Sequence, residues 1–113
     1  MNLNKLGRLQ SASTTFLLCD IQEIFRNKIH HFPSVISSTQ TLLSCMNTLQ
    51  IPTIVTTQYA KAFGNIVSEL DLKEQYKVTQ FDKTLFSMCT EEVNAQLKSN
   101  QTKSVILCGI EVS

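Results

Sequence analysis

Residues 105–111 read VILCGIE, an apolar run that enters a corner marked by glycine. Consecutive apolar residues without polar alternation predict a strand that is buried on both faces. A second such run, FLLC at 16–19, leads directly to Asp20 near the start of the chain. In parallel sheets, ligands and reacting groups gather where the carboxyl ends of strands meet loops. The two runs therefore predict one half of a functional site at Asp20 and another half just beyond Gly109.

The sequence between these runs begins with a predicted βαβ unit. A strand at 14–19 is followed by an apolar stripe at helical spacing from Val35 to Leu49, and Pro33 suits the first turn of this helix. The Ile-Pro pair at 51–52 ends the helix, because the residue before proline avoids helical geometry. A strand at 53–57 follows. Short links in the order strand, helix, strand predict parallel pairing and a right-handed crossover.

The remaining elements are fewer and less regular. Residues 78–81 predict a short third strand, with Asp-Lys-Thr following at 82–84. Thr90 is expected to cap a helix over 91–98, and the last strand is expected at 104–108. Three or four parallel strands with only two helices leave one sheet edge unpaired and the faces incompletely covered. On this ground we expect the chain to be part of a larger domain.

Length and composition predict a single globular domain. The chain has 113 residues, of which 42% are hydrophobic and 17% are charged. We expect one partial domain at 1–113, which includes an N-terminal arm at 1–13. The net charge is +1 and the basic residues are scattered, so no nucleic-acid partner is expected. No apolar stretch approaches the roughly 18 residues that span a bilayer, so no membrane partner is expected either.

The cysteines and histidines predict no metal site. No CxxC pair is present, and no histidine lies at ligand spacing from any of the four cysteines, Cys19, Cys45, Cys89 and Cys108. Free thiols and the lack of a secretory signal favour a cytoplasmic protein. Lys5 and Arg8, among several serines and threonines before the first acidic residue, leave a mitochondrial presequence as the alternative to an ordered arm.

Five groups of residues, taken in order along the chain, form a more specific pattern. They are FLLCDIQE at 16–23 with Phe25 and Arg26, FP at 32–33, IPTIVT at 51–56 with Gln58 and Tyr59, FDKT at 81–84 with FSM at 86–88, and VILCGIE at 105–111. This set resembles the isochorismatase-like cysteine hydrolase family, and within it the animal isochorismatase domain-containing proteins. The resemblance covers nearly the whole chain but only about the N-terminal half of a typical family domain.

The resemblance implies a three-layer α/β fold with a mostly parallel, doubly wound sheet, of which this chain would form the N-terminal part. It also implies an active site made of an aspartate, a lysine and a nucleophilic cysteine. By position Asp20 resembles the aspartate and Lys83 the lysine. The family's cysteine follows the corner and would lie beyond Ser113, so the chain as given is expected to be inactive.

The resemblance further implies an oxyanion-binding corner at Gly109, Ile110 and Glu111, with a non-proline cis peptide expected between the last two. Gln58, Tyr59 and Phe25 are the candidates for lining a substrate pocket. Nicotinamidases of the family hold a metal with an aspartate and two histidines after the second strand, and residues 58–64 read QYAKAFG instead. We therefore expect no metal, no cofactor and no nicotinamidase activity.

The leading interpretation is a hydrolase that acts on a small molecule and forms a homo-oligomer. Other interpretations remain open. The chain could be a non-catalytic interaction or regulatory protein that pairs with a full-length homologous subunit. A nucleotide-binding fold is disfavoured, because the chain has only three glycines and no G-x-G-x-x-G motif.

Some other side chains are expected to have structural rather than functional roles. Phe81, Phe86 and Met88 are expected in the core rather than in a pocket. His30 and His31 are expected to face solvent, and Cys89 is expected to be a packed thiol rather than a nucleophile.

Overall fold

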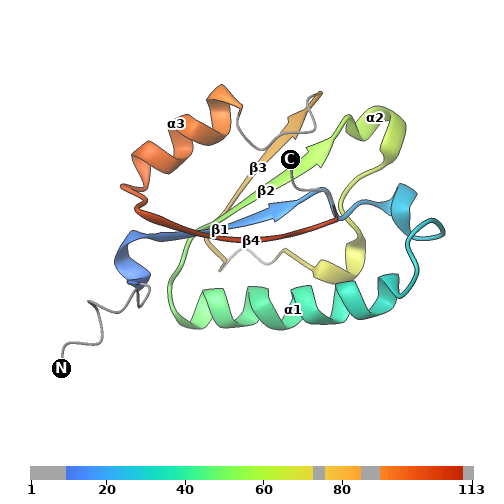
Figure 1. The fold of residues 1–113 in the computed structure, drawn as a ribbon, viewed down its shortest axis with the longest axis horizontal. Helices are drawn as coiled ribbons and strands as arrows, with labels where there is room; N and C mark the ends of the chain where they lie inside the picture. Colours follow the sequence, from blue (N-terminus) through green and yellow to red (C-terminus); the bar gives the residue numbers. More distant parts are fainter. Residues whose placement is uncertain (1–9, 73–75, 85–89, 111–113) are drawn as a thin grey trace.

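The computed structural model describes residues 10–72, 76–84 and 90–110, which form one sheet between helices (Figure 1). The strands are β1 (Thr14–Cys19), β2 (Thr53–Gln58), β3 (Val78–Lys83) and β4 (Ser104–Gly109). Every pair of neighbouring strands is parallel, and their spatial order is β3-β2-β1-β4. The predicted parallel α/β sheet is confirmed. Residues 1–9 of the predicted N-terminal arm lie outside the described residues.

The direction in which strands are added reverses at β1. The chain places β2 and then β3 on one side of β1, and it later returns to place β4 on the other side. Such a reversal leaves a crevice outside the carboxyl ends of the two strands that flank it. Asp20 directly follows β1 and Gly109 ends β4, so both residues lie at this switch point.

Helices cover the two faces of the sheet unequally. The long helix α1 (Phe32–Thr48) packs on one face and the shorter α3 (Glu91–Ser99) on the other, while α2 (Ala60–Phe63) is a single turn after β2 (Figure 1). Every residue of β1 is buried. Phe16 and Leu18 belong to the core under α1, and Leu17 and Cys19 to the core under α3. Because successive side chains of a strand point to opposite faces, coverage on both sides removes any polar alternation.

Helix α1 begins where the sequence predicted, but its buried stripe ends before the predicted last residue, Leu49. Pro33 lies in the first turn, as predicted. Leu49 does not belong to the buried stripe, because the helix ends at Thr48 and the Leu49 side chain is 54% exposed. The chain turns at Gln50, which has a φ of 59°, and Ile51 takes the buried position instead.

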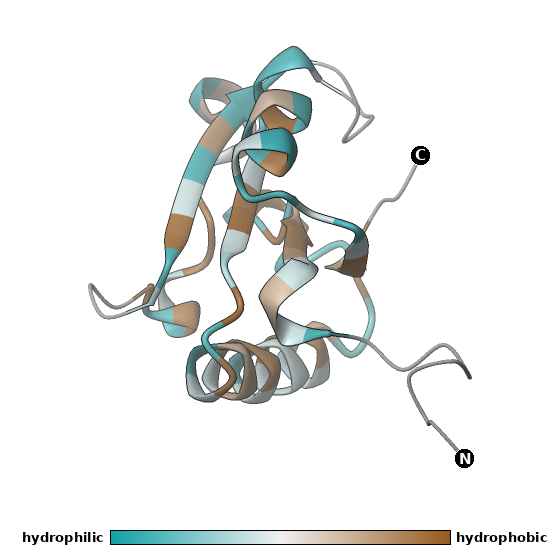
Figure 2. Ribbon diagram, turned by 90° about the vertical axis from the view of Figure 1, so that its left-hand side faces the viewer, coloured by the Kyte–Doolittle hydropathy of each residue, from teal (hydrophilic) through white to brown (hydrophobic). Residues whose placement is uncertain are grey.

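The third strand is longer than the sequence predicted. It extends through Lys83 rather than ending at Phe81, and it pairs with β2 up to the register Gln58↔Lys83. Figure 2 shows hydrophobic and hydrophilic residues along β3, the edge strand, whose residues are partly buried or exposed except for the buried Lys83. The predicted cap of α3 is confirmed, because the Thr90 side chain accepts a hydrogen bond from the Val93 backbone N–H at 3.2 Å.

The fourth strand is covered on one face only. Ile106 and Cys108 pack against the core under α1. Val105 and Leu107 point the other way and are 44% and 47% exposed. Within the described residues β4 pairs with β1 alone, which confirms the predicted open edge.

Candidate functional site

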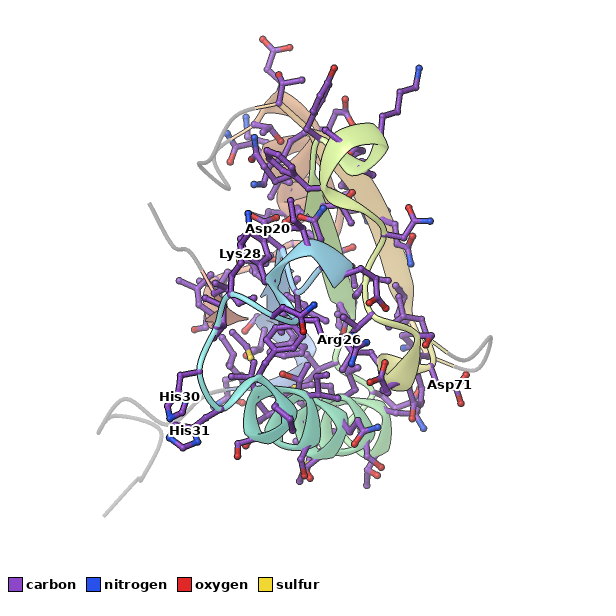
Figure 3. The ribbon with its side chains drawn as sticks, turned by 90° about the vertical axis from the view of Figure 1, so that its right-hand side faces the viewer. Asp20, Arg26, Lys28, His30, His31 and Asp71 are labelled. Carbon is purple, nitrogen blue, oxygen red and sulfur yellow. The ribbon has the colours of Figure 1, made fainter. Side chains whose placement is uncertain are left out.

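The three strand ends β1, β2 and β3 bring a carboxylate and an ammonium group into contact. Lys83 Nζ donates a hydrogen bond to Asp20 Oδ2 at 2.8 Å, and each side chain is only 3% exposed. Asp20 lies inside the molecule at the end of β1, whereas His30 and His31 extend from the loop before α1 (Figure 3). The two residues singled out from the sequence are 63 positions apart and meet as a buried ion pair.

The backbone geometry at Asp20 explains how its carboxylate is held. Its φ of 60° places it in the left-handed region, where aspartate is tolerated better than most residues. The Asp20 backbone N–H donates to the Thr56 carbonyl at 3.0 Å, and the Thr56 hydroxyl donates back to Asp20 Oδ1 at 2.9 Å. Both carboxylate oxygens are thus engaged, one by a neutral hydroxyl and one by the ammonium group of Lys83.

Gln58 supplies a second acceptor for the lysine. Its Oε1 lies 3.2 Å from Lys83 Nζ, and its Nε2 donates to the Thr84 carbonyl at 2.8 Å. The residue is 6% exposed. A buried ammonium group needs an opposite charge and further acceptors to offset its desolvation, and Asp20 and Gln58 provide them. Gln58 thus contacts Lys83, and whether it also touches a substrate stays a prediction.

Gln22 and Thr56 belong to this site although the sequence gave no separate reason to select them. Gln22 is fully buried, and its amide bonds both backbone groups of Gln58, with Gln22 Oε1 accepting at 2.6 Å and Gln22 Nε2 donating at 3.0 Å. The available signal was a glutamine between Ile21 and Glu23, two positions after a strand-end aspartate. Polar side chains that are buried in this way are nearly always hydrogen-bonded.

The corner after β4 approaches the end of β1 very closely. Gly109 is paired with Cys19, and a Cβ atom at position 109 would lie 2.5 Å from the Cys19 carbonyl oxygen. A side chain therefore has no room there, which explains the glycine. Ile110 is half-buried and packs against the core under α1. Glu111, and with it the expected cis peptide, lies outside the described residues.

The described cysteines do not supply a reactive thiolate beside the ion pair. Burial, and next the Asp20 charge, raise the pKa of Cys19 to about 12, so its thiol is protonated at neutral pH. Cys108 is half-buried, with its Sγ 3.5 Å from the Thr39 hydroxyl, and Cys45 is exposed. Cys89, Phe86 and Met88 lie outside the described residues.

The other two pocket candidates pack against aromatic or apolar side chains, and the Tyr59 backbone N–H donates to the Lys83 carbonyl at 2.8 Å. Tyr59 is 48% exposed, and its ring meets the Phe63 ring edge-on at a centroid distance of 6.2 Å. Phe25 is half-buried and packs against the core under α1. A small cleft of about 200 Å³ does reach Lys83, and it is lined by Phe81, Asp82, Lys83, Thr84, Thr90 and Glu92. Phe81 also packs against the core under α3 and is partly buried, so it belongs both to the core side and to this cleft, whereas the sequence predicted the core rather than a pocket.

Arg26 braces the loop that follows the site. It forms ion pairs with Glu23 at 2.9 Å and with Glu69 at 2.7 Å, all at the surface. Hydrogen bonding from Arg26 lowers the pKa of Glu69 to about 2. Exposed pairs of this kind contribute little to stability, but they tie the segment after β1 to the segment after α2.

The described residues contain no group of three or more His, Cys, Asp or Glu side chains that could hold a metal ion. None of their helices is both long and apolar enough to cross a membrane. The class of protein defined so far is a parallel α/β domain with a buried acid–ammonium pair at its strand ends.

The comparisons with known proteins place the chain in a family. A family model described as Isochorismatase domain matches residues 14–113. The secreted isochorismatase effector Isc1 of Phytophthora sojae (strain P6497) is 44% identical over 111 residues, covering 95% of this chain and 53% of that protein. Isochorismatase domain-containing protein 2 of Xenopus laevis is 40% identical over 111 residues, covering 97% and 53%. The chain therefore belongs to the isochorismatase domain family.

A solved structure agrees with this assignment. The MAR1 ribonuclease from Caenorhabditis elegans superposes with a TM-score of 0.82 at 40% identity, covering 92% of this chain and 53% of that one. The chain spans about half the length of the curated relatives named above, as the covered shares of 53% show.

Proposed function

We propose that this chain supplies the acid and the ammonium group of a metal-independent cysteine hydrolase site that acts on a small molecule. One observation carries the proposal, the 2.8 Å contact between Lys83 Nζ and Asp20 Oδ2 at the switch point of the sheet. Burying two charges costs several kcal/mol each, so such a pair is a candidate for function as well as for structure. The family membership supports the hydrolase class.

The chemistry follows from the charges. A thiol has an ordinary pKa of about 8.5 and is mostly protonated at neutral pH. The Asp20 carboxylate would accept the thiol proton as sulfur bonds to the electrophilic carbon of the substrate, and Lys83 would stabilise the thiolate. Backbone N–H groups after Gly109 would hold the developing oxyanion. The leaving group departs with the proton, and water then cleaves the sulfur–carbon bond and restores the thiol.

These 113 residues contain no cysteine after Gly109. Cys19 is a poor substitute, because burial, followed by the Asp20 charge, raises its pKa to about 12. We therefore propose that the chain by itself shows no turnover and that the reactive thiol belongs to sequence that follows the corner in longer relatives. The identity of the substrate stays undefined beyond a small molecule with an electrophilic carbon.

A screen of small esters, amides and carbamates tests this function. The 113-residue chain is compared with a chimera in which the second half of the Danio rerio isochorismatase domain-containing protein 2, 45% identical over 107 residues, is fused after the corner. We expect turnover from the chimera only. Asp20→Asn should lower the kcat of the chimera by about 10²–10⁴-fold, the usual contribution of a general base to the rate. Equal turnover by the short chain, or a chimera indifferent to Asp20→Asn, would refute the proposal.

A non-catalytic role in pairing with a full-length homologous subunit is the second candidate. The exposed Val105 and Leu107 on the open edge strand favour it, because exposed edge strands invite pairing with another chain. Size-exclusion chromatography with light scattering, alone and with a full-length relative, tests it. A stable monomer that ignores the relative would count against it.

The ribonuclease names carried by some structural relatives do not change the proposal. The net charge of +1 and the scattered basic residues offer no electrostatic footprint for RNA. We also propose that the protein acts in the cytoplasm and that the full-length form is a homo-oligomer, to be checked by cell fractionation and by light scattering.

A further inference from the structure

The loop after β1 contains a fully buried glutamine that extends the pairing between β1 and β2. The strand ladder ends at Cys19↔Thr56, where Asp20 turns into the left-handed region. Two residues later, the Gln22 side chain accepts from the Gln58 backbone N–H at 2.6 Å and donates to the Gln58 carbonyl at 3.0 Å. The Gln22 amide thus replaces the backbone partner that β1 no longer offers to Gln58.

A third bond fixes Gln22 itself. Its Nε2 also donates to the Gly64 carbonyl at 2.7 Å, and the Gln22 backbone forms an isolated antiparallel bridge with Ile66. The amide group therefore joins the end of β1, the end of β2 and the turn after α2. Each of its polar atoms has a partner, so the side chain has one well-defined position.

The Gln58 side chain in turn contacts the lysine. Its amide cannot be flipped without placing an N–H₂ group against Lys83 Nζ and an oxygen against the Thr84 carbonyl. The ammonium group thus donates both to Gln58 Oε1 at 3.2 Å and to Asp20 Oδ2 at 2.8 Å. The acceptor from Gln58 is neutral, so it orients Lys83 without adding a second negative charge beside Asp20.

We infer that Gln22 and Gln58 are positioning residues that hold the Lys83 ammonium group against Asp20, an arrangement that we call the amide clamp. The inference rests on the proposed function, because positioning matters only if Lys83 stabilises a thiolate. The clamp acts in series: Gln22 fixes the backbone of Gln58, and the Gln58 side chain fixes Lys83. Substitution of Gln58 should therefore disturb the lysine more than substitution of Gln22.

The test observes the lysine directly in the 113-residue chain. With ¹⁵N-lysine labelling, the Lys83 ammonium protons should exchange with water far more slowly than those of exposed lysines. Gln58→Met keeps the volume but removes the acceptor, and it should speed this exchange about tenfold or more, as the loss of one hydrogen bond to a charged group implies. Gln22→Met should act in the same direction by a smaller factor.

Two further variants separate positioning from simple stability. Gln40→Met is the matched control, because the exposed Gln40 bonds only the Glu69 carbonyl among the described contacts and should leave the Lys83 signal unchanged. Gln58→Asn keeps a neutral amide but shortens it, which withdraws the oxygen from Lys83 Nζ, so the exchange should be faster than in the wild type. If Gln58→Met fails to fold, Gln58→Asn decides alone, and exchange as slow as in the wild type would overturn the inference. Thermal unfolding is recorded for each variant, and destabilisation without faster Lys83 exchange would also overturn it.

The outcomes distinguish this inference from the proposed function. In an active chimera, Gln58→Met should lower kcat while KM changes little, since the clamp orients Lys83 rather than the substrate. If Lys83 exchange is slow and depends on Gln58 but the chimera has no hydrolase activity, the proposed function is refuted and the amide clamp is supported. If activity depends on Asp20 but Lys83 exchange does not depend on Gln58, the amide clamp is refuted and the proposed function is supported.

Discussion

The two sides of β1 differ in how completely their side chains are buried. On the side of β2 and β3, Asp20 and Lys83 are buried together with Gln58, and the described residues contain no buried side-chain nitrogen or oxygen without a hydrogen bond. On the side of β4, Val105 and Leu107 stay nearly half exposed. The comparison teaches that the polar site is assembled within the sheet, whereas β4 contributes a closely fitted corner and one covered face.

The sharpest way to break this comparison is to remove one charge of the buried pair. Asp20→Asn leaves Lys83 buried without its carboxylate and should lower the free energy of unfolding by about 3–5 kcal/mol, as measured by urea denaturation. Asp71→Asn is the matched control, because the Asp71 side chain is exposed and asparagine tolerates its φ of 46°. A loss in Asp20→Asn no larger than that of the control would show that the pair is not buried as described.

The corner of β4 can be tested at the point of closest approach. Gly109→Ala would place a Cβ atom 2.5 Å from the Cys19 carbonyl oxygen, so the backbone must shift. We expect a destabilisation of about 1–3 kcal/mol, the usual cost of overpacking a filled site. Ser104→Ala, at the other end of the same strand, should cost clearly less. Equal denaturation midpoints for the two variants would contradict the close fit.

The pH dependence of stability should report on Cys19, which lies beside the site. Burial, and next the Asp20 charge, raise its pKa from 9.0 to about 12, so the folded state holds the thiol proton after the unfolded state has lost it. The contribution of Cys19 is therefore fully present below pH 9 and is lost as pH rises toward about 12. The slope in this window is about 1.4 kcal/mol per pH unit at most.

The comparison of wild type with Cys19→Ala isolates this slope, because other groups that titrate in the same window are shared. Denaturation midpoints are measured at several pH values between about 8 and the onset of alkaline unfolding. Cys19→Ala should be less stable near neutral pH, where a cavity replaces the thiol, and should lose less stability on going to high pH. Parallel curves for the two proteins would show that Cys19 ionises in the folded state as it does in the unfolded state.

The smallest effect is expected at the exposed face of β4. Leu107→Lys replaces a side chain that is already 47% exposed, so stability should change by no more than about 0.5 kcal/mol. Any association of the chain through this edge should weaken, because a charge on an edge strand discourages pairing. Light scattering over a range of concentrations measures this. A large loss of stability would mean that the Leu107 side chain is covered.

Local patterns in the sequence predicted much of the fold. The uninterrupted apolar run of β1 indicated a strand covered on both sides, and the structure buries all six of its residues. Pro33 and Thr90 marked the starts of two helices, because each has a local physical role that needs no tertiary contact. The same local logic was wrong at Leu49, where a turn at Gln50 moved the buried position to Ile51.

The site was predictable only in part. Asp20 was indicated by its place after a buried strand, and Lys83 by its resemblance to a family motif. Gln22 and Thr56 were not selected, because glutamine and threonine are common polar residues and nothing local reveals that their side chains are buried. The lysine was also placed after its strand, whereas pairing with Gln58 extends β3 to include it.

The sequence by itself determined the alternation of strands and helices, the parallel sheet and the two charged residues of interest. The strands and helices depend on apolar periodicity, caps and prolines, which act over a few neighbouring residues, whereas Lys83 was selected only by the family resemblance. Only the tertiary structure decided that Asp20 and Lys83 touch, that Gln58 joins them and that Gly109 meets Cys19. Those contacts join residues up to 90 positions apart, as Cys19 and Gly109 are in the register of β1 and β4, and they exist because parallel strands bring their carboxyl ends to one edge.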